Sequence, residues 1–84
     1  PVTAQKAMTG HAIGASGAME IIATTLSLQN NLLLPTINLH EPDPACDLDY
    51  IPNVARAKNI DIALSNHFAF GGANAALVLC KHIA

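Results

Sequence analysis

The sequence predicts an α/β fold built from one helix and a small antiparallel sheet. Residues 14–30 carry apolar side chains at helical spacing, and residues 60–65 and 75–81 form two short apolar runs of strand length. Glycine and asparagine between the two runs favour a turn that pairs them as neighbouring antiparallel strands. Because the chain has 84 residues, these elements fit at most one small domain.

The composition is that of a piece of a larger protein. Of the 84 residues, 51% are hydrophobic and only 12% are charged, as in the interior of a larger body. A chain this short buries a modest fraction of its surface and is marginally stable alone. We therefore expect residues 1–84 to be a segment of a larger domain and not an independent one. The start at Pro1, without an initial methionine, fits this expectation.

Charge, hydropathy and cysteine usage argue against several classes of function. The net charge is −2 with four lysines and arginines in total, so we expect no nucleic acid partner. Short apolar runs predict no membrane span, and the first residues do not form a secretion signal. Two cysteines without such a signal favour reduced thiols in a cytoplasmic protein. The spacing of cysteines, histidines and glycines predicts no metal site and no dinucleotide cofactor.

The first half of the chain is expected to hold a loop and then the helix. Residues 1–12 read as a loop that follows a short strand, and the helix covers residues 14–30. Its apolar stripe contains Ala15, Ala18, Met19, Ile22 and Leu26. Other apolar residues lie off this stripe, so we expect burial on more than one side of the helix. Asparagines at positions 30 and 31 are expected to end it.

The second half is expected to hold three strands and one long connection. Residues 36–39 read as a short strand after Pro35. Residues 40–59 contain three of the five prolines and read as an irregular connection, longer than a compact domain normally keeps without a purpose. Residues 60–65 and 75–81 are the paired strands, and residues 67–74 are the loop between them.

Two separated segments carry the residues with chemical potential. Residues 6–17 read KAMTGHAIGASG, and residues 65–74 read SNHFAFGGAN. Together they resemble the C-terminal part of the β-ketoacyl-acyl carrier protein synthases, and residues 46–52 (CDLDYIP) resemble the type II synthases in particular. The resemblance runs over essentially the whole chain. It implies a thiolase-like layered fold, in which residues 1–84 form the C-terminal segment of a ketosynthase domain.

His11 is the first candidate catalytic residue. A histidine just before a helix faces the positive end of the helix dipole, which favours the neutral imidazole. A neutral imidazole can donate a hydrogen bond to a developing enolate or oxyanion. Taken alone, the residue could equally cap a turn. The resemblance implies that it assists decarboxylation of malonyl-carrier protein and stabilises the resulting carbanion.

Lys6 and Glu20 are the second candidate pair. Glu20 is the only acid between residues 1 and 40, and it lies on an otherwise apolar helix. A buried lysine or glutamate needs a partner, whereas two exposed side chains could be unrelated. The resemblance implies an ion pair that supports catalysis. It also implies that a monovalent cation can be held near Glu20, Ser65 and Asn66.

The phenylalanine and glycine loop is the third candidate. The resemblance implies that the Phe70 N–H forms half of an oxyanion hole, with the N–H of a cysteine outside this chain as the other half. It further implies that the Phe70 ring gates an acyl pocket and that Phe68, Gly71 and Gly72 contact substrate. Without the first segment, the same residues would describe a tight hairpin loop with two core phenylalanines. Glycines after an aromatic residue allow positive φ in either case.

The chain departs from the family pattern at three positions of this loop. His67 stands where a serine is common, Ala69 where a glycine is usual and Ala73 where a threonine is found. Alanine restricts φ and ψ relative to glycine, so Ala69 is expected to stiffen the gate and to affect the range of substrates.

The remaining cysteines and histidines are expected to be non-catalytic. Neighbouring carboxylates disfavour the thiolate of Cys46, and Cys80 lies in an apolar strand pattern where a packed thiol is expected. His40 and His82 read as surface residues at the ends of elements.

The resemblance implies an acyltransferase that performs a decarboxylative Claisen condensation of an acyl chain with malonyl-acyl carrier protein. The implied partners are acyl- and malonyl-loaded acyl carrier protein, the remainder of the ketosynthase chain and a second copy in a homodimer. The isolated segment is expected to be inactive, because the nucleophilic cysteine and a second histidine lie upstream in the family. Two alternatives remain open: a catalytically silent homologue that sets chain length, and a free-standing α/β interaction module.

Overall fold

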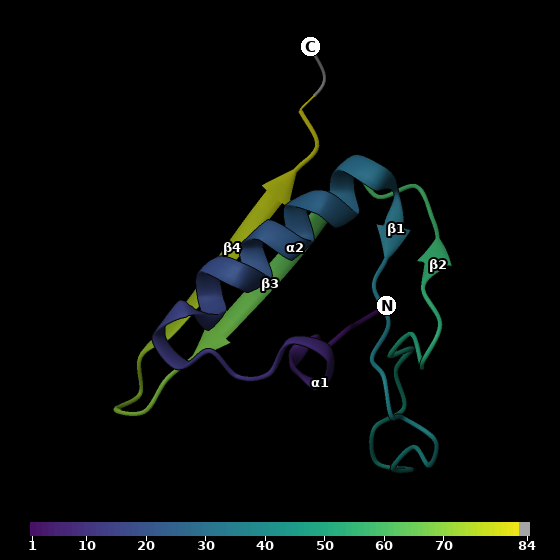
Figure 1. The fold of residues 1–84 in the computed structure, drawn as a ribbon, viewed down its shortest axis with the longest axis horizontal. Helices are drawn as coiled ribbons and strands as arrows, with labels where there is room; N and C mark the ends of the chain where they lie inside the picture. The colour runs from purple at the N-terminus through teal and green to yellow at the C-terminus, as the bar shows by residue number, and fades with distance from the viewer. Residues whose placement is uncertain (83–84) are drawn as a thin grey trace.

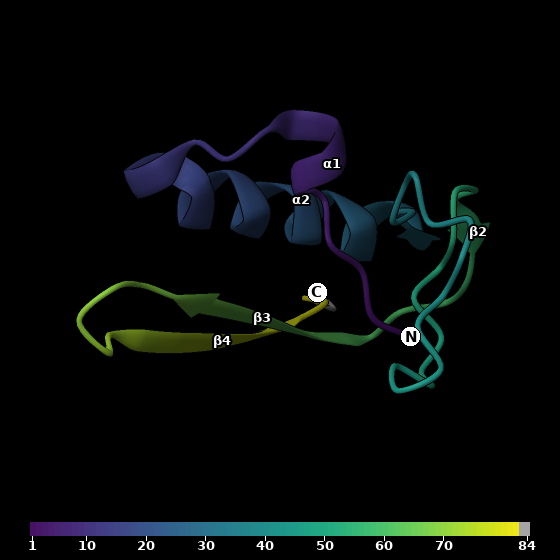
Figure 2. The ribbon, with the colours of Figure 1, turned by 90° about the horizontal axis from the view of Figure 1, so that it is seen from below.

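A computed structural model describes residues 1–82 and shows a helix lying along a two-stranded hairpin (Figure 1). The helix α2, Ser16–Asn30, packs against the antiparallel strands β3, Ile62–Phe68, and β4, Asn74–Cys80. A second, smaller ladder pairs β1, Leu32–Leu33, with β2, Arg56–Ala57. Helix and hairpin form two layers when seen from below (Figure 2). The α/β fold class predicted from the sequence is confirmed.

The segment before α2 is more ordered than the loop expected over residues 1–12. It contains a one-turn helix, α1, Lys6–Thr9, and a 3₁₀ turn, η1, Ile13–Ala15. Gly10 ends α1 with a φ of 77°, a conformation that costs little only for glycine. The loop prediction was therefore wrong at α1. A four-residue helix has no periodic pattern long enough to show in the sequence.

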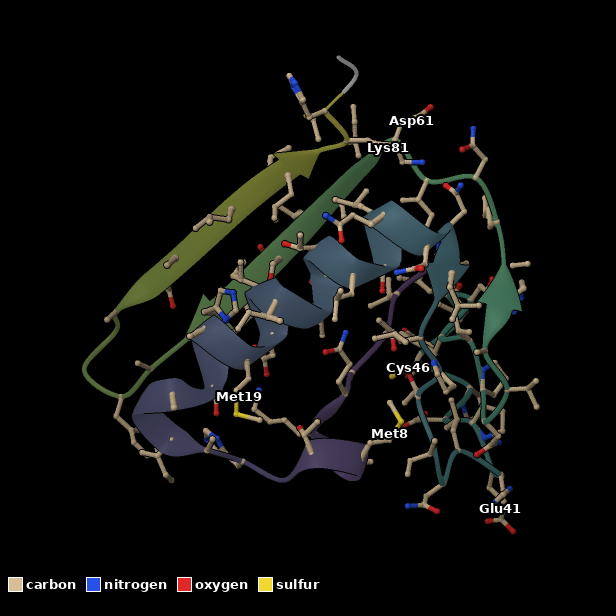
Figure 3. All side chains as sticks on the ribbon, turned by 45° about the horizontal axis from the view of Figure 1, so that its top comes forward. Met8, Met19, Glu41, Cys46, Asp61 and Lys81 are labelled. Atoms are coloured by element: carbon tan, nitrogen blue, oxygen red, sulfur yellow. The ribbon has the colours of Figure 1, made fainter. Side chains whose placement is uncertain are left out.

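The helix α2 confirms the predicted element, with a start two residues later than expected. Asn31 follows it with a φ of 51° and donates its N–H to Ser27, a left-handed end that asparagine tolerates. The predicted stripe is largely exposed: Ile22 is 61% exposed and Met19 points away from the hairpin (Figure 3). The opposite face contains Gly17, Glu20 and the buried Leu28, and this face lies on β3.

The strand predicted over residues 36–39 is wrong. Only Thr36 pairs, through an isolated parallel bridge to Pro52, and Asn38 turns the chain with a φ of 64°. The Asn53 side chain then binds both backbone groups of Leu39, accepting from its N–H at 3.2 Å and donating to its carbonyl at 2.7 Å. A side chain thus supplies the hydrogen bonds that a neighbouring strand would have given.

The long connection over residues 40–59 is mostly irregular, as predicted, and a carboxylate organises its end. The Asp49 carboxylate accepts a hydrogen bond from the Ile51 N–H at 3.1 Å and from two nitrogens of Arg56. The Arg56 side chain, with help from the Ile51 N–H, lowers the pKa of Asp49 to about 2. These contacts hold Ile51, which is 1% exposed, at a φ of 51°.

The hairpin confirms the predicted antiparallel pair, with a shifted first strand. The register runs from Ile62 opposite Cys80 to Phe68 opposite Asn74, so the loop is shorter than residues 67–74. Alternate residues of β3 face α2, and these include the buried Ser65 and the half-buried His67. Their neighbours Leu64 and Phe68 lie on the other face and are exposed.

The core formed by the described residues is small. Leu28 and Ile51 are the buried hydrophobic residues within 1–82, at 4% and 1% exposure. Apolar side chains lie uncovered on the outer face of α2 and on the outer face of the hairpin. Among the same residues, no helix is both long enough and apolar enough to cross a membrane.

Candidate active site

The Lys6 and Glu20 side chains meet where α1 lies beside α2. Lys6 Nζ donates a hydrogen bond to Glu20 Oε1, which gives the ion pair expected from the sequence. The Glu20 side chain is 20% exposed and the Lys6 side chain 44% exposed, so the pair is partly open to water on the lysine side. Helix α1 positions the lysine at its first residue, and α2 positions the glutamate one turn after its start.

His67 contacts the other oxygen of the same carboxylate. Its Nδ1 lies 3.0 Å from Glu20 Oε2, and its Nε2 lies 2.8 Å from the Ser65 hydroxyl. The ring packs over Gly17, where an added Cβ would sit 3.6 Å from Nδ1. From the sequence alone, His67 was expected only as a departure from the family pattern in a loop. Its spacing of two residues from Ser65 was the signal that both side chains share one face of a strand.

His11 lies between α1 and η1, with one ring nitrogen occupied. Its Nδ1 accepts a hydrogen bond from the Ile13 N–H at 3.1 Å and lies 2.8 Å from the Ser16 hydroxyl. Ile13 has a φ of 52°, an uncommon conformation for a β-branched residue. Because Nδ1 accepts from a backbone donor, the neutral ring carries its proton on Nε2. The exposed His11 therefore presents an N–H donor on the side away from its own backbone.

The phenylalanine and glycine loop closes the hairpin. Gly71 and Gly72 have φ values of 86° and 79°, so the positive φ expected for them is confirmed. The Ala69 N–H donates to the Ala73 carbonyl at 2.8 Å, which closes the loop around them. The Phe70 ring is fully exposed, and its N–H has no acceptor within residues 1–82. Neither phenylalanine is a core residue of the described chain.

The structure thus brings four polar residues together and leaves two candidates separate. Lys6, Glu20, His67 and Ser65 form a continuous chain of contacts, which we call the Glu20 cluster. A cleft of about 770 Å³ runs beside it and is lined by Lys6, Glu20, Ser65, Asn66 and Phe68, among others. No hydrogen bond or ion pair within residues 1–82 joins His11 or Phe70 to this cluster.

The two cysteines lie outside the cluster. Cys46 is exposed in the long connection, away from the hairpin (Figure 3). Cys80 is also exposed, so the packed thiol expected there is wrong for the described chain. Cys80 lies opposite Ile62 on the outer face of the hairpin, and alternation along the strand decides that face. His40 and His82 are exposed, as expected.

The layered fold and the segments at residues 6–17 and 65–74 can be compared with known proteins. A family model described as "Beta-ketoacyl synthase, C-terminal domain" matches residues 1–40. The chain belongs to the β-ketoacyl synthases, whose thiolase-like fold it shares. Within this class it corresponds to the C-terminal part of a type II ketosynthase.

Relatives from two pathways support this assignment. The chain is 50% identical over 80 residues to 3-oxoacyl-acyl-carrier-protein synthase 2 of Coxiella burnetii, which covers 95% of this chain and 19% of that protein. It is 47% identical over 81 residues to the tetracenomycin polyketide synthase ketoacyl synthase alpha subunit of Streptomyces glaucescens, which covers 96% of this chain and 19% of that protein. The chain therefore spans about a fifth of the length of these relatives.

Two solved structures are similar in fold as well as in sequence. One is a type II polyketide ketosynthase in complex with its acyl-carrier protein and bound to the hexaketide, with a TM-score of 0.95 and 40% identity over 99% of this chain and 20% of that one. The other is the ishigamide ketosynthase/chain length factor, with a TM-score of 0.92 and 41% identity over 95% of this chain and 20% of that one.

Proposed function

We propose that this chain is part of an acyltransferase that condenses an acyl chain with malonyl-acyl carrier protein. The observation that carries the proposal is how the structure arranges the side chains of residues 6–17. Lys6 is paired with Glu20, and the hydrogen bond to Nδ1 leaves the Nε2 donor of His11 unengaged within the described residues. Identities of 47–50% to fatty-acid and polyketide synthases support the same reaction class.

The reaction needs a donor at a developing negative charge. Decarboxylation breaks the bond between the malonyl carboxylate and C2, releases carbon dioxide and leaves the electron pair in an enolate. The C2 atom then attacks the carbonyl of the acyl thioester, and a cysteine thiolate leaves. An N–H placed at the enolate oxygen stabilises that charge more than the neutral carbonyl, so it lowers the barrier.

His11 supplies that donor through Nε2 in this proposal. The Ile13 N–H and the Ser16 hydroxyl hold Nδ1, so the ring does not have to rotate or change tautomer before it acts. Lys6 and Glu20 keep the segment before α2 in place. The Phe70 N–H, which has no acceptor within residues 1–82, donates to the oxyanion formed when the acyl thioester is attacked.

The partners and setting of the whole protein follow the same proposal. The acyl and malonyl groups arrive on acyl carrier protein, and the thiolate and a second histidine come from outside these 84 residues. We infer a cytoplasmic homodimer, as is usual for the family. The isolated segment is expected to be inactive, because the nucleophilic cysteine of the family lies outside these 84 residues and neither Cys46 nor Cys80 belongs to the Glu20 cluster.

A second candidate is a silent subunit that shapes the chain-length pocket. The similarity of this chain to a solved ketosynthase/chain length factor supports this second candidate. The two functions are separated by one experiment on the full-length protein. Radiolabelled malonyl-acyl carrier protein is added with and without acyl-loaded acyl carrier protein. Carbon dioxide release and formation of the 3-oxoacyl product are then measured. Release and product support the enzyme, whereas neither would be formed by a silent subunit.

A further inference from the structure

We propose that His67 is a positioning residue that holds Glu20 in place, and that its imidazole occupies the position of the monovalent cation implied by the family resemblance. The implied cation would sit near Glu20, Ser65 and Asn66. In this chain, the Glu20 carboxylate and the Ser65 hydroxyl both lie against nitrogens of the same ring, at 3.0 Å and 2.8 Å. The effect on catalysis rests on the proposed function, but the position of the ring does not.

The oxygen atoms that a cation would need are already in contact with other groups. Lys6 takes one oxygen of Glu20, and His67 contacts the other. The Ser65 hydroxyl, which is buried, has its contact with His67 Nε2. A hard cation requires several oxygen ligands directed at one point. Here the space between the two oxygens is filled by the ring, so the residues present do not fit a cation.

The ring suits this position in either protonation state. The carboxylate places the ring proton on Nδ1, because an N–H facing an anion is favoured over a lone pair. The serine hydroxyl donates to Nε2 when the ring is neutral and accepts from it when the ring is protonated. No buried side-chain polar atom among residues 1–82 is left without a partner. The cluster is therefore satisfied without an ion.

The consequence is a fixed link across α2. Figure 2 shows α1 and the hairpin on opposite sides of α2. The Glu20 carboxylate is contacted by Lys6 from α1 and by His67 from β3, so it joins the two sides. Through this link, His67 holds the segment that ends in His11 without touching it. His67 is thus a positioning residue, and substrate contact is not part of its role.

The test compares the full-length protein with its His67→Ser variant in two salts. Thermal unfolding is followed in potassium chloride and in N-methylglucamine chloride at equal ionic strength. The serine variant frees Glu20 Oε2 and opens space beside Ser65, so potassium should bind and raise its unfolding midpoint by about 3 °C or more. The unchanged protein should show the same midpoint in both salts. His40→Ser, which alters an exposed histidine elsewhere, is the matched control.

Activity gives the second readout. Carbon dioxide release from malonyl-acyl carrier protein by the unchanged protein should be equal in the two salts. The His67→Ser variant should lose on the order of tenfold in kcat in N-methylglucamine chloride, with KM little changed, and potassium should restore most of it. A merely structural role would lower activity in both salts alike.

The outcomes are distinct for the two proposals. Potassium-dependent unfolding of the unchanged protein would show that the cation site is intact and would overturn the inference about His67. If the unfolding midpoint of the His67→Ser variant were the same with and without potassium, the inference about His67 would be overturned as well. If the full-length protein releases no carbon dioxide and forms no product, the proposed function fails. The comparison of unfolding midpoints in the two salts still decides whether the His67 ring takes the place of the ion. If the His67→Ser variant does not fold, the potassium dependence of the unchanged protein decides the question alone.

Discussion

Two histidines in this chain differ in which ring nitrogens are free. His11 has a partner for Nδ1 only, so its Nε2 can act on a bound substrate. His67 has partners for both nitrogens and is 20% exposed. With both nitrogens engaged inside the Glu20 cluster, His67 has no free N–H to donate to a bound substrate, whereas a ring held by one nitrogen is oriented and keeps its second nitrogen free. The same residue type therefore serves two roles, His11 just before α2 and His67 on β3.

The role proposed for His11 predicts a selective defect. His11→Ala in the full-length protein should lower the rate of malonyl decarboxylation by on the order of 10²–10³, because one donor at the enolate is lost. Acyl transfer to the enzyme should be spared, since it requires a thiolate and an oxyanion hole. Carbon dioxide release and acyl-enzyme formation are measured separately, with His40→Ala as the control. Normal decarboxylation by the variant would remove His11 from the mechanism.

Ala69 leads to a prediction about the hairpin loop. In this structure the positive φ values of the loop belong to Gly71 and Gly72, not to Ala69. If the Phe70 ring must swing aside to admit an acyl chain, Ala69→Gly should speed acyl transfer and broaden the range of chain lengths, because glycine opens the positive-φ region. Acylation rates across a series of chain lengths are compared for both proteins, with Ala45→Gly as the control.

An identical chain-length profile would rule out the gating role of Ala69. In that case, the substitution acts only by adding entropy to the unfolded chain. The expected loss is then about 0.4–1 kcal/mol of stability, with selectivity unchanged.

At the level of elements, α2 carries apolar side chains on two opposite faces, one of which also holds Glu20. One face, with Gly17 and Leu28, lies on β3, and the other, with Met19, Ile22 and Leu26, is uncovered in this chain. A helix that is apolar on both sides is stable in water only between two layers. This arrangement agrees with the thiolase-like fold, which places helices between sheets.

The contact between the long connection and β2 predicts a dependence on pH. The folded pKa of Asp49, at about 2, lies below its usual 3.8, so the ion pair with Arg56 favours the folded state above about pH 4. This contribution should decline as the pH falls from about 4 towards 2. The stability difference between the full-length protein and Arg56→Gln should therefore be constant from pH 7 to 4 and shrink below.

Denaturant midpoints at several pH values from 7 to 3 check this expectation. Lys58→Gln is a suitable control, because Lys58 is exposed next to β2 and makes no ion pair within residues 1–82. A difference that grows as the pH falls would contradict the assigned direction of the Asp49 pKa.

For the whole molecule, the expected outcome is that residues 1–84 do not fold stably alone. Only Leu28 and Ile51 are buried hydrophobics within the described chain, and the apolar faces of α2 and the hairpin are open. So little apolar burial does not offset the conformational entropy that 84 residues lose on folding. The isolated chain should show no cooperative thermal transition by circular dichroism, and it should associate at high concentration. A sharp, reversible transition of a monomer would contradict the assignment as a segment.

Local patterns in the sequence were sufficient for α2 and for the hairpin, but not for the Lys6–Glu20 pair. Helical periodicity and the strand–turn–strand pattern involve residues close together in the sequence, so both can be recognised without tertiary information. The family motifs place Lys6 and Glu20 by resemblance, and the structure confirms their contact. Helix α1 was missed because four residues are too few to show a periodic pattern, whereas the β1–β2 ladder and the turn at Asn38 were missed because they depend on partners far along the chain.

Only the tertiary structure decided the position of His67. The sequence places the first strand of the hairpin at residues 60–65 and His67 in the following loop. In the structure β3 extends to Phe68, so His67 is a strand residue on the same face as Ser65. Because side chains alternate across a strand, one residue of shift would have turned the ring away from α2. The packing of α2 on β3 sets that register, and it brings the imidazole to the Glu20 carboxylate.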